Sequence, residues 1–220
     1  MRILFFKEKN WDKKVSEFIL KTHIKKLKKI NLVLTGGRSA KKIYKFLIPF
    51  FLKLKTKINI FLSDERCVDI SNSNLNFNIF TNFSEKNKIN IFPIIINSSF
   101  ISCAKKYSKI SPSKPDLALL SLATDGHVAS IFNREPILKK KKYIFVKKKF
   151  NGFKRITLTY HYLKECKKII IICNNTKRVK ALIKYMNKKT YIINNLLNLK
   201  KTSILMKEKG YKFFMRNKNI

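Results

Sequence analysis

The sequence predicts a single α/β domain, built on a mostly parallel β-sheet with helices on both faces. Short apolar runs alternate with segments of helical periodicity, and several runs are apolar throughout, as strands buried on both faces are. At three places an apolar run ends in glycines or charged residues. A chain of 220 residues that is 45% hydrophobic is long enough to enclose one full core. We therefore expect one domain over residues 1–220.

The N-terminal half supplies most of the predicted alternation. Apolar residues at helical spacing predict a helix over residues 11–27. The run NLVLT at residues 31–35 predicts a strand that ends at Gly36 and Gly37, and a helical pattern follows around residues 43–47. The remaining elements of this half are two strands, a short helix and a fourth strand: residues 58–62, 89–96, 101–110 and 116–122.

The second half continues the pattern with two strands and two helices: residues 155–159 and 169–173, then 162–167 and 177–186. Residues 203–206 and 211–215 indicate edge strands. Alternating strands and helices imply a parallel sheet, in which ligands bind outside the carboxyl ends of the strands. The glycines and charged residues at which three of the apolar runs end, residues 36–37, 64–66 and 125–127, occupy that position.

The net charge raises the question of a polyanionic partner. The chain has 50 Lys and Arg against 12 Asp and Glu, a formal charge of +38, which is typical of nucleic-acid binding. However, the lysines are spread along the whole chain and accompany many Asn, Ile and Phe residues, which AT-rich codons encode. We therefore interpret the composition as that of an AT-rich genome, with salt-sensitive adhesion to nucleic acid but no specific nucleic-acid partner.

No apolar run approaches the roughly 18 residues that a bilayer span requires. The apolar residues 1–6 are followed at once by charged residues, which leaves no signal peptide. The four cysteines form no CxxC pair. The sequence thus predicts a cytoplasmic protein with reduced thiols and without a membrane contact.

The segment Thr35, Gly36, Gly37, Arg38 and Ser39 lies between a predicted strand and a predicted helix. Glycines there let the backbone approach an anion, and a helix N-terminus offers free N–H groups. The segment is either a phosphate-binding turn or an ordinary strand-to-helix turn. The arginine and the two hydroxyls favour phosphate binding.

The charged cluster Asp64, Glu65 and Arg66 follows the strand at residues 58–62. Such a cluster serves acid/base chemistry or lies solvated on the surface. Arg66 has the forked donors best suited to an anion.

The cluster Asp125, Gly126 and His127 follows the strand at residues 116–122. Histidine exchanges a proton near neutral pH, and a neighbouring aspartate can orient its ring. The alternative is a loop histidine held by a backbone partner. His23 and His161 lie in a basic helix and after a strand, and we assign them no role.

Four motifs in order carry a resemblance to the 6-phosphogluconolactonase family: LTGGRSA at 34–40, SDERCV at 63–68, DLALLSLATDGHVASIF at 116–132 and RITLT at 155–159. The resemblance spans roughly residues 32–184. It implies a Rossmann-like α/β fold, shared with glucosamine-6-phosphate deaminases and ribose-5-phosphate isomerases. It also implies no metal, no cofactor and a role in the oxidative pentose phosphate pathway.

The resemblance further implies roles for individual residues. His127 would be the general base, Asp125 would orient it, and Arg66 or backbone N–H groups near Gly126 would stabilise the oxyanion. The residues implied to bind the substrate phosphate are Gly36, Gly37, Arg38, Ser39, Arg155 and Lys177. The partner would be a small-molecule sugar-phosphate lactone, bound by a monomer or weak homo-oligomer.

The chain departs from the family pattern at several positions. Ser121 and Ala123 replace glycines, Thr124 replaces an acid, and Asn174 replaces the glycine three residues before Lys177. One rival interpretation is a sugar-phosphate isomerase or deaminase of the same fold, although the deaminase glutamate five residues after the histidine is Phe132 here. The other rival is a non-catalytic homologue that binds sugar phosphate or nucleic acid. Asp64 or Glu65 would be the base if His127 is not.

Overall fold

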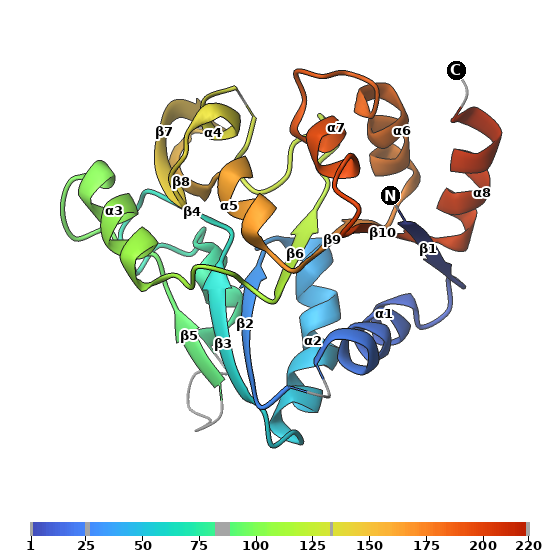
Figure 1. Ribbon diagram of the computed structural model, residues 1–220, viewed down its shortest axis with the longest axis horizontal. Helices are drawn as coiled ribbons and strands as arrows, with labels where there is room; N and C mark the ends of the chain where they lie inside the picture. The colour runs from blue at the N-terminus through green and yellow to red at the C-terminus, as the bar shows by residue number, and fades with distance from the viewer. Residues whose placement is uncertain (1, 25–26, 82–88, 133, 219–220) are drawn as a thin grey trace.

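The computed structural model describes residues 2–24, 27–81, 89–132 and 134–218. Two sheets organise the chain, one of seven strands and one of three. In the large sheet the strands follow the order β1-β10-β9-β6-β2-β3-β5, and every neighbouring pair is parallel (Figure 1). Its strands are β1 (Arg2–Phe6), β2 (Lys29–Leu34), β3 (Lys57–Leu62), β5 (Ile89–Phe92), β6 (Leu117–Ser121), β9 (Lys168–Cys173) and β10 (Thr202–Lys207).

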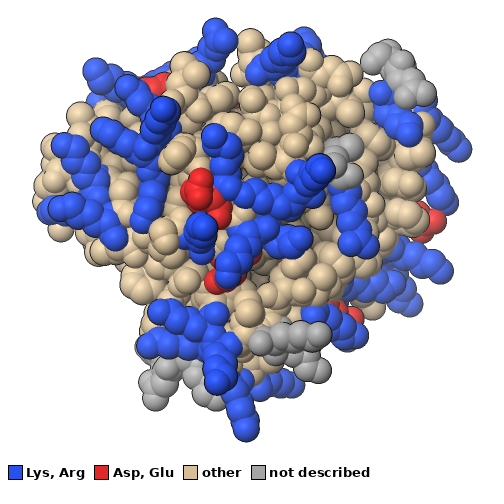
Figure 2. All heavy atoms as spheres, viewed as in Figure 1, with Lys and Arg blue, Asp and Glu red and all other residues tan. Residues whose placement is uncertain are grey.

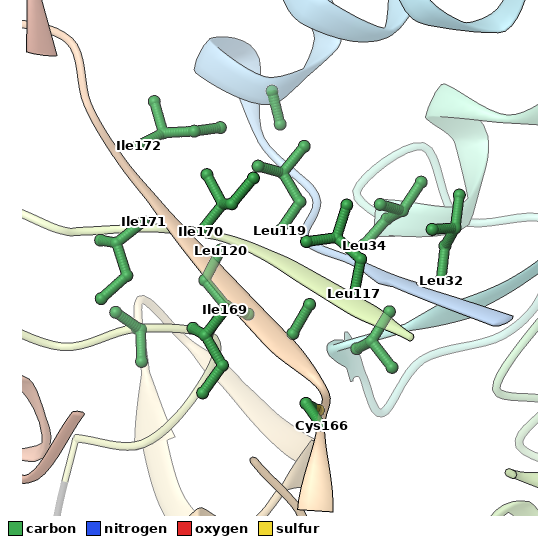
Figure 3. Close-up of a cluster of buried hydrophobic side chains, with 14 of the residues drawn as sticks. Leu32, Leu34, Leu117, Leu119, Leu120, Cys166, Ile169, Ile170, Ile171 and Ile172 are labelled. Carbon is green, nitrogen blue, oxygen red and sulfur yellow. The ribbon is translucent and has the colours of Figure 1, made fainter. Parts of the chain in front are cut away.

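The central strands of this sheet are buried on both faces. In β3 and β9 every residue after the first lysine is buried, so consecutive Ile and Leu side chains enter the core from both sides. Figure 3 shows such side chains from β2, β6 and β9 packed together, among them Leu32, Leu119 and Ile170. Each buried side chain of this size contributes roughly 1.5–3 kcal/mol. This packing fixes the strand ends that carry the polar clusters.

Helices cover both faces of the large sheet. Figure 1 shows α1 and α2 together on one side and α5 and α7 on the other, while α4 lies by β7 (Tyr143–Phe150) of the small sheet. For the helix predicted over residues 11–27, the structure has α1 followed by a π-helical turn (Leu20–Ile24). Residues 25–26 of the predicted range lie outside the described residues. The helices are α1 (Trp11–Ile19), α2 (Arg38–Leu52), α3 (Phe100–Ile110), α4 (Glu135–Leu138), α5 (Tyr160–Glu165), α6 (Thr176–Tyr185), α7 (Ile192–Leu197) and α8 (Glu208–Asn217).

The small sheet is antiparallel and consists of β4 (Asp64–Arg66), β8 (Phe153–Leu158) and β7 (Tyr143–Phe150), with β8 in the middle. The expectation that residues 155–159 join the parallel sheet is therefore wrong. These residues form most of β8, because the hairpin turn at Asn151 and Gly152 folds β8 back onto β7. Both turn residues have positive φ, 50° and 80°, as a tight two-residue hairpin requires.

Two expectations for the C-terminal segment are corrected. Residues 203–206 lie in β10, which is not an edge strand but pairs with β1 on one side and β9 on the other. Residues 211–215 lie in α8, not in a strand. Gly210 and Phe214 are buried four residues apart, and this spacing places one apolar stripe of a helix against the core.

On one face of the molecule the basic side chains do not gather in one place. Figure 2 shows Lys and Arg spread over most of this face, with few Asp and Glu among them. No helix in the described part of the chain is long and apolar enough to cross a bilayer.

Candidate active site

A polar pocket of about 190 Å³ opens at the carboxyl ends of β2, β3, β6 and β9. β2 and β6 are neighbours in the large sheet. The next strand of this sheet along the chain after β2 is β3, on one side of the pair, and the next after β6 is β9, on the other side. Ligands bind at such a switch point in parallel sheets. The lining residues are Thr35, Gly36, Gly37, Ser39, Asp64, Arg66, Asn76, Ser121, Leu122, Ala123, His127, Ala129, Ser130, Phe150, Asn151, Arg155 and Arg178.

The glycine turn after β2 forms one wall of this pocket. Gly37 has a φ of +94° and precedes the first turn of α2, whose N–H groups have no intrahelical partner. A Cβ at Gly36 would lie 1.9 Å from Oδ1 of Asn76, so this position excludes every other residue as long as Asn76 stays in place. The turn thus offers close approach and N–H donors to an anion. The side chain of Arg38 lies outside the described part of the structure.

The His127 imidazole and the Asp125 carboxylate are close neighbours in the loop after β6. Nδ1 of His127 lies 2.6 Å from Oδ1 of Asp125, and the side chains are 15% and 47% exposed. The contact with His127 lowers the pKa of Asp125. Nδ1 has no partner in regular hydrogen-bond geometry, but the short separation keeps the two groups in direct contact. With Nδ1 at the carboxylate, Nε2 is the nitrogen left for proton transfer.

Backbone constraints shape the loop that carries His127. The Ala123 N–H donates to the His127 carbonyl at 2.8 Å and closes a tight turn. Gly126, at the centre of this turn, has a φ of +87°, and a Cβ there would lie 2.5 Å from the ring of Tyr185. The local sequence needs glycine for both reasons.

Asp64 ties the His127 loop to the small sheet. Its Oδ2 accepts a hydrogen bond from the Ser130 hydroxyl at 2.7 Å, and its Oδ1 accepts one from the Ser63 hydroxyl at 2.6 Å. The Ser130 N–H donates to the Thr157 hydroxyl of β8 at 3.2 Å. Asp64 therefore both lines the pocket and fixes its neighbours.

Glu65 is fully buried and does not line the pocket. Its carboxylate accepts hydrogen bonds from the backbone N–H groups of Arg66, Asn76 and Phe77 at 2.7–2.8 Å. Burial nevertheless raises its pKa to about 7. Glu65 thus anchors the segment that presents Asn76, and it is poorly placed to serve as the alternative base.

Two arginines enter the pocket from the small sheet. Arg66 of β4 and Arg155 of β8 lie directly opposite each other in the antiparallel ladder. Nη1 of Arg66 donates to the Asn74 carbonyl and to Oδ1 of Asn76 at 2.6 and 2.5 Å. Arg155 is only 5% exposed, and its Nη1 has no hydrogen-bond partner. Burial, and then Arg66, lowers the pKa of Arg155.

A third arginine reaches the pocket from α6. Arg178 lines the pocket, and its Nη1 donates to the Ser121 hydroxyl at the end of β6. Its neighbour Lys177, which the family resemblance implies as a phosphate ligand, is exposed and is not among the lining residues. Ser121, which replaces a family glycine, is thus used to hold Arg178.

Aromatic rings border His127 on the side of the small sheet. Phe132 and Phe150 are stacked with centroids 5.0 Å apart, and both rings are edge-on to the imidazole. The hairpin of β7 and β8 places Phe150 and Asn151 at the pocket wall. The pocket therefore combines an apolar wall with cationic and hydrogen-bonding groups.

The structure brings Gly36, Gly37, Ser39, Arg66, His127 and Arg155 into this one pocket. Asp125 lies behind His127 and does not line it. Sequence reasoning missed Asn76, Ser130, Phe150, Asn151 and Arg178. The NG pair at 151–152 was a turn signal that predicts a hairpin, and the arginine beside Lys177 was visible. Nothing in the sequence places Asn76 against Gly36.

This arrangement places an imidazole beside cationic and hydrogen-bonding groups of the kind that bind anions. Three guanidinium groups, hydroxyls and a helix N-terminus converge, while Asp64 is the carboxylate among the lining residues. In the described residues, no group of three or more His, Cys, Asp or Glu side chains is arranged to hold a metal ion.

Comparison with curated proteins finds several relatives. The chain is 30% identical over 162 residues to a 6-phosphogluconolactonase of Thermotoga maritima, covering 70% of this chain and 73% of the relative. It is 27% identical over 212 residues to a 6-phosphogluconolactonase of Borreliella burgdorferi, covering 84% and 85%.

Solved structures share the fold. A 6-phosphogluconolactonase of Thermotoga maritima superposes with a TM-score of 0.80 at 24% identity, covering 94% of this chain and 98% of the other. A monomeric glucosamine-6-phosphate deaminase gives 0.77 at 15% identity, covering 96% and 99%. The profile of the family described as glucosamine-6-phosphate isomerases/6-phosphogluconolactonase matches residues 11–192. The protein, with its switch-point pocket and this match over most of its length, belongs to that family.

Proposed function

We propose that the protein is a 6-phosphogluconolactonase, which hydrolyses 6-phospho-D-glucono-1,5-lactone to 6-phosphogluconate in the oxidative pentose phosphate pathway of the cytoplasm. The observation that carries the proposal is the buried Arg155, with its unpartnered Nη1, in the same pocket as His127. A buried donor without a partner favours an anionic ligand. The relatives' names support the same activity.

The substrate phosphate is anchored by the glycine turn and the arginines. Gly36, Gly37 and Ser39 offer backbone N–H groups and a hydroxyl at the start of α2, and Arg155 and Arg178 add charge. This anchor holds the lactone carbonyl near His127. Binding energy from the non-reacting phosphate thereby positions the reacting carbon.

His127 then acts as the general base. It takes a proton from the attacking water as the water oxygen bonds to the lactone carbonyl carbon, and it gives the proton to the ring oxygen as the ring C–O bond breaks. Asp125, 2.6 Å away, stabilises the protonated imidazole. Arg66 is the donor for the tetrahedral oxyanion. No cofactor takes part in these steps.

The lactonase is favoured over a deaminase by the residue five positions after His127. Glucosamine-6-phosphate deaminases resemble this chain in motif order but have a glutamate there. Phe132 cannot exchange a proton, and it is stacked on Phe150 with centroids 5.0 Å apart. This position, beside His127, therefore lacks the acid that amino-sugar chemistry needs.

The test is hydrolysis of the lactone by the purified protein, measured against spontaneous ring opening and beside glucosamine 6-phosphate as the rival substrate. Faster opening of the lactone without ammonia release from the amino sugar is the expected result. Binding of 6-phosphogluconate without faster ring opening would contradict the proposal and indicate a non-catalytic sugar-phosphate-binding homologue.

A further inference from the structure

Phe150 contacts two groups that have different tasks in the proposed function. Its ring lies edge-on to the His127 imidazole, with centroids 5.0 Å apart and an interplanar angle of 78°. Its carbonyl oxygen accepts a hydrogen bond from Nη2 of Arg155 at 3.2 Å. The side chain of Phe150 therefore contacts the proposed base, while its backbone contacts an anion-binding arginine.

The imidazole needs a second constraint besides Asp125. A carboxylate contact at Nδ1 fixes one atom of the ring, but the ring can still turn about that point. The Asp125 side chain is about half exposed, and Nδ1 lacks a partner in regular hydrogen-bond geometry. The groups that pack against the ring therefore supply the remaining constraint on its orientation.

Two phenylalanines pack there, and they come from different parts of the chain. Phe132 has its ring centroid 5.9 Å from that of His127 at 84°, but it belongs to the same loop as His127 and moves with it. Phe150 belongs to the small sheet. Among these two rings, Phe150 is the one that fixes the imidazole relative to Arg155.

The hairpin holds Phe150 in place. Phe150 ends β7 and pairs with Phe153 of β8, directly beside the tight turn of Asn151 and Gly152. The ladder is irregular between Val146 and Phe150, and such an irregularity re-aims the side chains that follow it. Its ring is half-buried against Phe132.

We propose that Phe150 is a positioning residue, whose ring holds the His127 imidazole in the orientation required for proton transfer to a substrate anchored at Arg155. This inference rests on the proposed function, in which His127 is the base. The ring and the carbonyl act separately, so loss of the ring leaves the Arg155 contact in place. Removal of the ring should slow the chemical step and spare substrate binding.

The experiment compares three variants of the full chain. Phe150→Leu removes the ring and keeps an apolar side chain, and Phe150→Tyr keeps the ring. Phe145→Leu is the matched control, because Phe145 lies in the same strand but packs against Phe100 and does not line the pocket. We measure kcat and KM for the lactone, thermal melting, and the NMR nuclear Overhauser effects between the carbon-bound imidazole protons of His127 and the ring protons of Phe132, which report the orientation of the imidazole.

For Phe150→Leu we expect kcat to fall by about 10- to 100-fold with KM within about twofold, as for a base displaced by less than about 1 Å. Phe150→Tyr should keep kcat within about threefold, and Phe145→Leu should do the same. The Overhauser effects between His127 and Phe132 should change in Phe150→Leu alone. An equal loss of kcat in Phe145→Leu would overturn the proposal, because the effect would then be general loosening of β7.

The NMR measurement separates this proposal from the proposed function. If the unaltered protein does not hydrolyse the lactone, the proposed function fails. Overhauser effects between His127 and Phe132 that change in Phe150→Leu but not in Phe145→Leu would then still support the positioning role. Unchanged Overhauser effects in Phe150→Leu would overturn it, whatever the activity.

Discussion

Arg66 and Arg155 are cross-strand partners in the ladder between β4 and β8, so two guanidinium groups face one pocket from adjacent strands. Like charges in opposite positions of a sheet are destabilising. Arg66 contributes to the lowered pKa of Arg155, and Asp64 and Glu65 act in the opposite direction. An anionic ligand that contacts both arginines, its phosphate at Arg155 and its other end at Arg66, would relieve this repulsion.

Anion binding should therefore stabilise the protein. At a concentration of 6-phosphogluconate 100 times its Kd, we expect about 2.7 kcal/mol of stabilisation. For a chain of this size, that corresponds to a rise in Tm of roughly 5–10 °C, measurable by differential scanning fluorimetry.

Arg155→Ala should abolish most of this rise and mainly raise KM, because the phosphate contact is made in both the ground state and the transition state. The control is Arg216→Ala in α8, which lies outside the pocket. An undiminished rise in Tm for Arg155→Ala would place the anion elsewhere.

His127→Ala should remove most of the catalysis and leave ligand affinity nearly unchanged. Loss of a general base costs about 10²- to 10⁴-fold in rate, whereas the phosphate is held by other residues. Steady-state kinetics above the spontaneous background and calorimetric titration with 6-phosphogluconate check both parts. Near-normal turnover would require another base, and Asp64 is then the candidate that lines the pocket.

The neighbours Arg178 and Lys177 allow a paired test. Arg178 lines the pocket and Lys177 is exposed, so we expect Arg178→Ala to raise KM by about tenfold or more, as the loss of a charge-assisted contact does. Lys177→Ala should leave KM within about twofold. The opposite result would restore the role that the family resemblance implies for Lys177. Both substitutions remove one positive charge, so a change in net charge cannot explain a difference between them.

Glu65 should make stability depend on pH. Its pKa is raised from 4.5 to about 7 by burial, so between these values the folded state holds a proton that the unfolded state has lost. The free energy of unfolding therefore falls as pH rises from about 4.5 to 7, by roughly 3 kcal/mol for this group.

Urea unfolding at pH 5 and pH 8 measures this difference. Glu65→Gln should remove most of the contribution, and Glu165→Gln, an exposed position on α5, should retain it. Equal pH dependence in Glu65→Gln and the unaltered protein would show that the carboxyl is ionised throughout, stabilised by its three N–H donors.

The parallel sheet could be predicted because its signals are local. The runs at residues 58–62 and 169–173 are apolar throughout and are followed by turns or helices, and β3 and β9 confirm them. Residues 155–159 have a similar apolar pattern but belong to the small sheet. Their pairing with β7 and β4 depends on tertiary contacts, which the local sequence does not show. Aromatic residues at 211–215 suggested a strand, whereas burial of Phe214 against the core favours the helix α8.

The site residues that follow predicted strands could be predicted. Those that other parts of the chain bring to the pocket could not. His127 and Arg66 come directly after predicted strands. Asn76 reaches the pocket because Glu65 binds its backbone N–H at 2.7 Å, a contact between residues 11 apart. Phe150 reaches it through a hairpin whose register is irregular, and the sequence carries no marker of such an irregularity.

The pairing of β1 with β10 has a consequence for how the chain is made. Arg2 lies beside Ser203 in the sheet, and β10 is the strand that pairs with β1 in the described part of the chain. At about 5–20 residues per second, the ribosome needs roughly 10–40 s to add the intervening 200 or so residues. During that time the segment RILFF is without its partner and exposes an apolar strand edge to chaperones or to other nascent chains. This strand, synthesised about 200 residues before its partner, is thus among the last to be placed.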